Sequence, residues 1–120
     1  MRHRKNSAIL NRPADQRKAL IRNLITSLFL YGKVQTTEAK AKALQPAAEK
    51  LITKVKSQDD MNAIRSAMQV VYTEDASKAL LAYAKKTTKT SGFTRVTRIG
   101  YRAGDNALKV QVELITDESI

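Results

Sequence analysis

The segment TRVTRIGYRAGDNALKVQVEL, residues 94–114, decides the fold class of this chain. Its first nine residues are rich in Thr, Val, Ile and Tyr, which favour strands. In its last seven residues apolar and polar side chains alternate strictly, as on a half-buried strand. Between these two parts, residues 103–106 read Ala-Gly-Asp-Asn, which are residue types that turns prefer. The segment therefore predicts an antiparallel β-hairpin.

Residues 13–31, upstream of the hairpin, have the apolar spacing of a helix. Pro13 suits a first helical turn, where its missing N–H is not needed, and Gly32 supplies a stop. One face is predicted to be polar, with Arg22, Asn23, Thr26 and Ser27. The opposite, wide stripe holds the expected core residues: Leu20, Ile21, Leu24, Ile25, Leu28, Phe29 and Tyr31.

A short strand and a second helix are expected next. Residues 33–36 are β-branched enough for a strand, and Thr36 or Thr37 can cap the helix that follows. Pro46 lies inside that helix and should kink or divide it, because it removes one backbone hydrogen bond. The helix repeats its apolar positions at spacings of three and four: Ala41, Leu44, Ala48, Leu51 and Val55.

Two further helices are predicted before the hairpin. Ser57 and Asp60 resemble a capping box for the first of them, and Thr73 can cap the second. The first continues through the apolar positions Met61, Ile64, Met68 and Val71. The second packs through Ala76, Leu80 and Tyr83 and ends in Lys85 and Lys86. We therefore expect an α+β fold of two layers, with three or four helices on one face of a small sheet.

The chain has 120 residues, a length typical of one domain. We divide it into an extended basic arm at 1–12, a globular body at 13–116 and an acidic tail at 117–120. It has no cysteine and no apolar stretch long enough to span a bilayer, so we expect a cytosolic protein and no membrane partner.

The net charge of +11 is concentrated in two segments. Residues 1–22 hold seven Arg and Lys with Asp15 as their one acid, and residues 85–102 hold six cations and no acid. The remaining 80 residues together carry −1. Solvated surfaces normally mix charges of both signs, so we interpret these two segments as binding surfaces for a polyanion.

The sequence contains few residues suited to catalysis. His3 is the one histidine, the four glycines are scattered, and most acids stand at predicted helix starts. These features exclude a Ser-His-Asp arrangement, a metal pair of histidines and a glycine-rich phosphate loop. We therefore predict no enzyme, no catalytic or metal-binding residue, no cofactor and no small-molecule substrate.

The residues of the two basic segments are better suited to nucleic-acid binding. Cations, hydroxyls and backbone N–H groups are the usual partners of phosphate oxygens. At the start of the first helix, Arg17, Lys18 and Arg22 can contact phosphates together with free backbone N–H groups. Phe93 suits either a stacked base or, as we favour, a hydrophobic position at the sheet edge. The second segment contributes Lys85, Lys86, Lys89, Thr94, Arg95, Arg98 and Arg102.

A folded RNA fits these features better than duplex DNA. The first helix is predicted to bury most of its surface, which leaves no recognition helix for a groove. Six Tyr and Phe are too few for a base-stacking sheet. A nucleoid-type or regulatory DNA-binding protein is the alternative, and an enzyme acting on a polyanion is the third hypothesis.

Several motifs also resemble a known family. These are Met1-Arg2-His3-Arg4-Lys5, Leu10-Asn11-Arg12, Gly92-Phe93-Thr94-Arg95 and Arg102-Ala103-Gly104-Asp105-Asn106-Ala107. In this order they are similar to the bacterial large-subunit ribosomal protein seventeen family, over nearly the whole chain. This sequence differs from the pattern around Ser91-Gly92 and Leu108-Lys109 and in its acidic end.

The resemblance implies a single α/β domain with helices on a three-stranded sheet, mixed or antiparallel, and no enzymatic activity. It implies binding to large-subunit (23S) rRNA near the exit of the peptide tunnel, beside neighbouring ribosomal proteins. Thr94 and Arg95 follow as contacts in the loop. The leading RNA contacts that it implies are in the arm: Arg2, His3, Arg4, Lys5, Asn11 and Arg12.

Overall fold

The computed structural model describes residue 10, residues 13–87 and residues 92–115. Within them the elements follow the order α1 (Ala14–Tyr31), β1 (Lys33–Thr37), α2 (Glu38–Lys56), α3 (Asp60–Met68), α4 (Glu74–Lys86), β2 (Thr94–Tyr101) and β3 (Leu108–Leu114). The arm at 1–9 and 11–12, the loop at 88–91 and the tail at 116–120 lie outside the described residues.

The three strands form one antiparallel sheet in the order β1-β3-β2. Val112 stands opposite both Val34 and Val96, and Glu113 stands opposite both Lys33 and Arg95. Residues paired across a ladder share a face, so the valines lie on one face of the sheet and the charged row lies on the other. The predicted hairpin is confirmed, and its alternation places Val110 and Val112 in the core.

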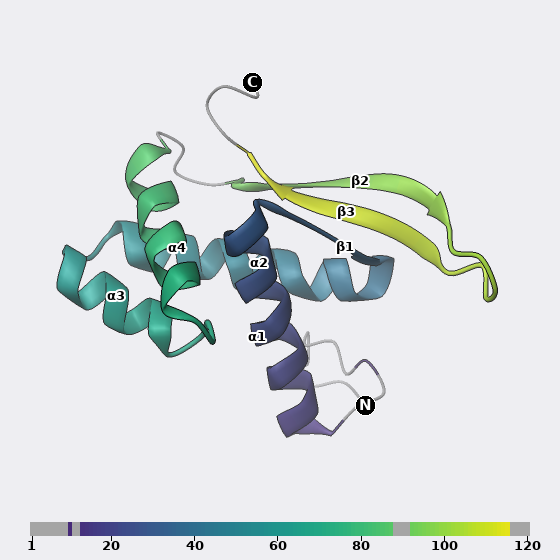
Figure 1. Cartoon of the computed structure of the whole chain (residues 1–120), viewed down its shortest axis with the longest axis horizontal. Coiled ribbons are helices and arrows are strands. Elements are labelled where there is room, and N and C mark those ends of the chain that lie inside the picture. Colours follow the sequence, from purple (N-terminus) through teal and green to yellow (C-terminus); the bar gives the residue numbers. More distant parts are fainter. Residues whose placement is uncertain (1–9, 11–12, 88–91, 116–120) are drawn as a thin grey trace, which may run out of the picture.

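The helices occupy one side of this sheet (Figure 1). α1 and α2 contact the strands directly. α4 packs against α1 and α2, α3 packs against α2 and α4, and together they extend the helical layer beyond the sheet. The hairpin in turn reaches past the helices on its own side (Figure 1). The predicted α+β fold of two layers is confirmed, with four helices and three strands in the described residues.

Helix α1 begins after Pro13 and ends at Gly32, as predicted. Gly32 adopts φ +78°, the left-handed conformation that favours glycine, and donates its N–H to the Leu28 carbonyl at 2.8 Å. Two side chains differ from the predicted faces. Tyr31, the last residue of α1, is 75% exposed and lies outside the core. Thr26 is buried, because the turn between α3 and α4 covers the face that looks polar in the sequence.

Helix α2 runs from Glu38 to Lys56 with Pro46 inside it, so of the two expected effects of this proline, a kink or a division, the division does not occur. Leu44 and Ala48 on either side of the proline are fully buried. Their packing holds both halves of α2 to the body, although proline removes one hydrogen bond from the helix.

The predictions for α3 are wrong in two respects. Its cap is Asp59, whose Oδ1 accepts the Asn62 N–H at 3.0 Å, while the Ser57 hydroxyl donates to the Lys54 carbonyl. The predicted apolar face is also rotated: Met61 is 65% exposed and Met68 is half exposed, whereas small residues are buried, namely Ala63, Ser66 and Ala67. A close crossing with α2 and α4 admits small side chains there and excludes the methionines.

The start of β2 is attached to the helices through Phe93. Thr73 caps α4 as predicted by accepting the Ala76 N–H. Near the other end of α4, the Tyr83 ring meets Phe93 edge-on, with ring centroids 6.5 Å apart. Phe93 is 1% exposed, which confirms the hydrophobic position and excludes base stacking in this fold.

The hairpin turn is held by a local ion pair. The Arg102 guanidinium donates to both carboxylate oxygens of Asp105, and Asp105 Oδ1 also accepts the Ala107 N–H at 3.2 Å. Gly104 adopts φ +105° and Asn106 φ +57°, conformations that Gly and Asn tolerate best. The hydrogen bonds from Arg102, and then that from Ala107, lower the pKa of Asp105 from 3.8 to about 2.

We expect this carboxyl to titrate near pH 2 in the folded protein. Because its folded pKa is depressed, Asp105 stabilises the fold fully above pH 3.8, and this contribution is lost as the pH falls towards about 2. A carbon-13 NMR titration of the side-chain carboxyl measures the pKa directly. Arg102→Ala should return it towards 3.8. An unshifted titration in the original chain would contradict the ion pair.

Candidate nucleic-acid interface

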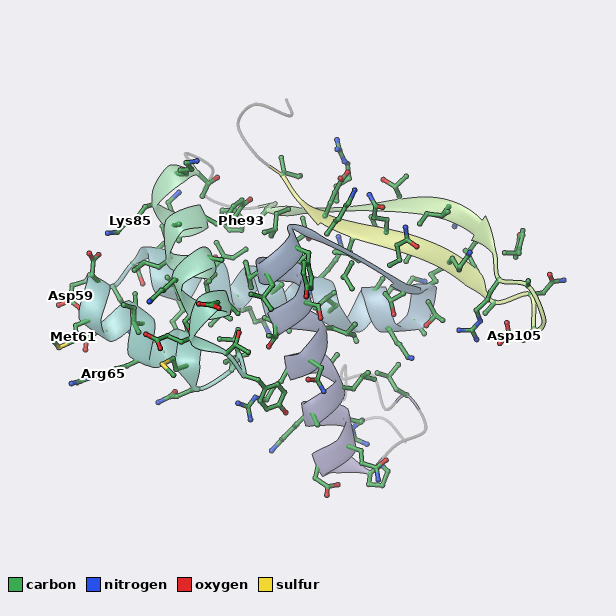
Figure 2. All side chains as sticks on the ribbon, viewed as in Figure 1. Asp59, Met61, Arg65, Lys85, Phe93 and Asp105 are labelled. Carbon is green, nitrogen blue, oxygen red and sulfur yellow. The ribbon has the colours of Figure 1, made fainter. Side chains whose placement is uncertain are left out.

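The predicted binding residues do not form one surface in the described structure. Lys85 at the end of α4 and Asp105 in the hairpin turn lie at opposite ends of the molecule (Figure 2), and the basic end of α1 lies away from both (Figure 1). Seven predicted residues lie outside the described part of the chain: Arg2, His3, Arg4, Lys5, Asn11, Arg12 and Lys89.

The basic residues of α1 line a groove of about 500 Å³. Arg17, Lys18 and Arg22 come from α1, and Lys50 and Lys54 come from α2. No acidic residue is among the described residues that line the groove. No carboxylate of the described part of the chain lies within ion-pair distance of Lys18, Lys50 or Lys54. The groove is therefore a concave, partly apolar surface surrounded by positive charges. Their combined electrostatic field attracts an anionic partner.

Lys50 and Lys54 were not predicted from the sequence. They lie in the near-neutral middle of the chain, where a count of charge along the sequence averages them with Glu49, Asp59 and Asp60. A helical projection gives a signal, because Lys50 and Lys54 are four residues apart and share one face of α2. Their proximity to α1 follows only from the crossing of the two helices.

The first turn of α1 offers fewer free donors than expected. Asp15 Oδ1 accepts the Gln16 N–H at 3.0 Å. This carboxylate also places a negative charge at the helix start, where a phosphate would otherwise be favoured. The cations of α1 can therefore bind an anion through their position beside the groove more than through free N–H groups at the helix terminus.

Arg22 makes contacts inside the protein. Its Nε donates to the Val70 carbonyl at 2.6 Å, and its guanidinium lies 4.1 Å from the centre of the Tyr72 ring. Thr26 Oγ1 donates to the Arg22 carbonyl at 2.7 Å and accepts the Tyr72 N–H at 3.1 Å. These contacts, here called the Arg22 clamp, fix the turn between α3 and α4 against α1. Since Val70 lines the groove, the clamp shapes its wall.

We expect Arg22→Ala to lower the free energy of unfolding by about 1–3 kcal/mol, because a charge-assisted hydrogen bond and a cation–π contact are lost. The salt dependence of RNA binding should stay unchanged, since a residue engaged within the protein neutralises no phosphate. Lysine lacks the planar guanidinium, so Arg22→Lys should recover only part of the stability. If the slope of log affinity against log salt became shallower by about one, Arg22 would instead be a phosphate ligand.

The cations of the second segment are mostly paired with carboxylates of this chain. Lys85 bonds Asp60 at 2.7 Å, Arg95 bonds Glu113 at 2.6 Å, and Arg102 pairs with Asp105. Arg98 stands 3.9 Å from Glu38, and Lys86 is exposed at the end of α4. Exposed ion pairs of this kind contribute about 0–1 kcal/mol, so a phosphate can replace the carboxylate at little cost.

Arg95 and Arg98 of β2 point to opposite faces of the sheet, because they pair with Glu113 and Val110, which lie on opposite faces of β3. One continuous phosphate chain therefore cannot contact both from the same side. Thr94 is 8% exposed; its hydroxyl accepts from the Gln45 amide and donates to Glu49, which ties β2 to α2. Thr94 thus acts within the fold.

A separate, smaller groove lies where the hairpin meets α2. It measures about 300 Å³ and is lined by Gln35, Thr36, Thr37, Lys40, Arg102 and Lys109. Its cations come from three separate elements of the chain, and only Arg102 was predicted. Lys40 and Lys109 become neighbours because β1 and β3 are paired and α2 starts directly after β1.

Other kinds of site have no support in the described residues. They contain no cluster of three or more histidine, cysteine or acidic side chains placed to hold a metal ion. None of the described helices is both long enough and apolar enough to cross a membrane.

Fold and surface together define a small basic α+β domain in which cations from two helices surround an acid-free groove. The family model described as ribosomal protein L17 matches residues 20–115. The chain belongs to the ribosomal protein L17 family. This confirms the resemblance noted in the sequence, and with it the prediction of a structural ribosomal protein that is not an enzyme.

Three relatives match along nearly their whole length. The large ribosomal subunit protein bL17 of Desulforapulum autotrophicum is 43% identical over 120 residues, which cover 98% of this chain and 99% of the relative. That of Gemmatimonas aurantiaca is 44% identical over 120 residues, with 96% and 98% covered. That of Chloroflexus aurantiacus is 39% identical over 117 residues, with 96% and 100% covered.

Proposed function

We propose that this protein is a structural component of the bacterial large ribosomal subunit and binds 23S rRNA through the groove between α1 and α2. The single observation that carries this proposal is the set of cations around the groove, with no acid in its described lining. The relatives are named large ribosomal subunit protein bL17, and these names support the large ribosomal subunit as the assembly. The ribosome gives the protein a cytoplasmic location.

The arm and the hairpin supply further proposed contacts, and those of the hairpin lie on a surface separate from the groove (Figure 1). The arm adjoins the start of α1, so its cations lie next in sequence to those of the groove. Arg95, Arg98 and Arg102 contact RNA by exchanging carboxylates for phosphates, and Lys85, Lys86 and Lys89 contact a separate stretch of backbone. A position near the exit of the peptide tunnel, beside other ribosomal proteins, rests on the family resemblance alone.

Duplex DNA is the competing partner. α1 and α2 bury their apolar faces in the core, so neither presents a full helical face to a major groove. A concave surface with cations on both sides instead suits a folded RNA, which offers phosphates from more than one direction.

A competition assay tests the proposal. The full-length protein is given a structured 23S rRNA fragment and duplex DNA at equal phosphate concentration, and retention is followed as salt is raised. We expect a preference for the RNA that persists at elevated salt, and co-sedimentation with the large subunit through a high-salt wash. Equal retention of both nucleic acids would favour the DNA-binding alternative.

A further inference from the structure

The floor of the groove between α1 and α2 is apolar, which binding to phosphates alone does not require. Ile25 and Leu51 form buried parts of this floor, and Ile21, Ala47 and Val70 are partly exposed to the groove. Cations stand around it on α1 and α2. The surface thus offers an apolar base with a positive rim, and its partner should combine a flat apolar part with negative charge on both sides.

We propose that this groove holds one unstacked nucleobase of an RNA strand, with the phosphates on either side of that base at Lys18, Lys50 and Lys54. The inference rests on the proposed function, since it names what the same groove takes from the RNA. An unpaired nucleotide supplies both required parts, because its base has apolar faces and its flanking phosphates are anionic.

The dimensions and polar groups of the groove support a base. Its volume of about 500 Å³ lies within the range of roughly 300–1,000 Å³ found for small-molecule sites. Two polar side chains also line it. Ser66 Oγ donates to Gln58 Oε1 at 2.8 Å, which leaves the oxygen as an acceptor, and the exposed Gln69 amide can both donate and accept. Both can therefore contact the edge of a base.

The groove is preformed on the side of α3. The Arg22 clamp holds the Val70 carbonyl and Tyr72 against α1, so the wall needs no ordering when a base enters. Preformed walls reduce the entropy cost of binding. The other partner that combines apolar and acidic character is an acidic peptide, and the test below separates the two.

The test uses RNA hairpins that differ at one position. The first set carries one unpaired nucleotide in the stem, with each of the four bases in turn, and a matched hairpin carries an abasic residue at the same place. Binding to the full-length protein is measured at fixed salt. We expect the preferred base to bind about tenfold more tightly than the abasic residue, the lower range for a base held by side chains.

Ala47→Leu fills the groove from α2 without changing its charge, so it should abolish the difference between the two hairpins. Ala39→Leu, an exposed position on the same helix, is the matched control and should preserve the difference. Circular dichroism verifies that both variants fold. Where Ala47→Leu does not fold, Gln69→Ala serves instead: it should remove the preference among the four bases, and a retained preference would overturn the proposal.

Three results would refute the inference. These are equal affinity of the original protein for the base-containing and abasic hairpins, discrimination by Ala47→Leu as strong as in the original chain, and displacement of both hairpins by an acidic leucine-containing peptide with no effect of the base. Failure of the proposed function has a different signature, because the protein would then bind every RNA no better than duplex DNA.

Discussion

Replacing Lys50 and Lys54 together with glutamine should weaken RNA binding by about 25- to 60-fold at roughly 0.1 M salt. Each lysine that neutralises a phosphate releases a counterion, so each loss lowers affinity by about five- to eightfold under these conditions. The slope of log affinity against log salt should also become shallower by about two. Fluorescence anisotropy over a series of salt concentrations measures both quantities.

The matched control for this experiment is the double variant Lys42→Gln and Lys78→Gln. These lysines carry the same total charge, but each is exposed and pairs with a glutamate one turn earlier on its own helix, Glu38 and Glu74 respectively. We expect only a small change in affinity for the control. Equal losses for both double variants would mean that RNA responds to overall charge, and the groove would lose its special role.

The second large effect concerns stability. Phe93→Ala should lower the free energy of unfolding by about 3–5 kcal/mol, because a ring that is 1% exposed leaves a cavity between α4 and the sheet. This is a substantial part of the roughly 5–15 kcal/mol typical of a domain. Urea unfolding followed by circular dichroism measures the loss.

RNA affinity separates this structural role from base stacking. At a temperature where the variant remains folded, Phe93→Ala should bind RNA as the original chain does. Tyr101→Ala removes a ring that is 71% exposed and should leave stability nearly unchanged. Weaker RNA binding by Phe93→Ala without a loss of stability would contradict the buried position of the ring.

Features that depend on a few neighbouring residues were predicted from the sequence. The hairpin turn is held by Asp105 within it and by Arg102 directly before it, and the left-handed Gly32 ends α1 where the apolar stripe stops. Thr73 caps α4 through a donor three residues away. Such interactions are complete within a short segment, so their residue types carry the signal. The start of α3 is the exception, because Ser57 and Asp59 are both suitable caps and Asp59 takes the role.

Features that depend on the crossing of helices were predicted poorly. Met68 looks like a core residue at helical spacing but is half exposed, and Thr26 looks like a surface residue but is buried. α3 meets α2 and α4 through its small residues, and the space at such a crossing decides which side chains fit. Periodicity identifies an apolar stripe and does not report its width or its partner.

The same distinction applies to function. By itself the sequence determined a basic α+β protein with a hairpin, a charged start and no catalytic constellation, because composition and local pattern carry this information. Only the tertiary structure brought Lys50 and Lys54 beside Lys18, engaged Arg22 within the protein and paired the hairpin arginines with carboxylates. These relations join residues far apart in the chain, and they arise from the packing of α1, α2 and the sheet around one core.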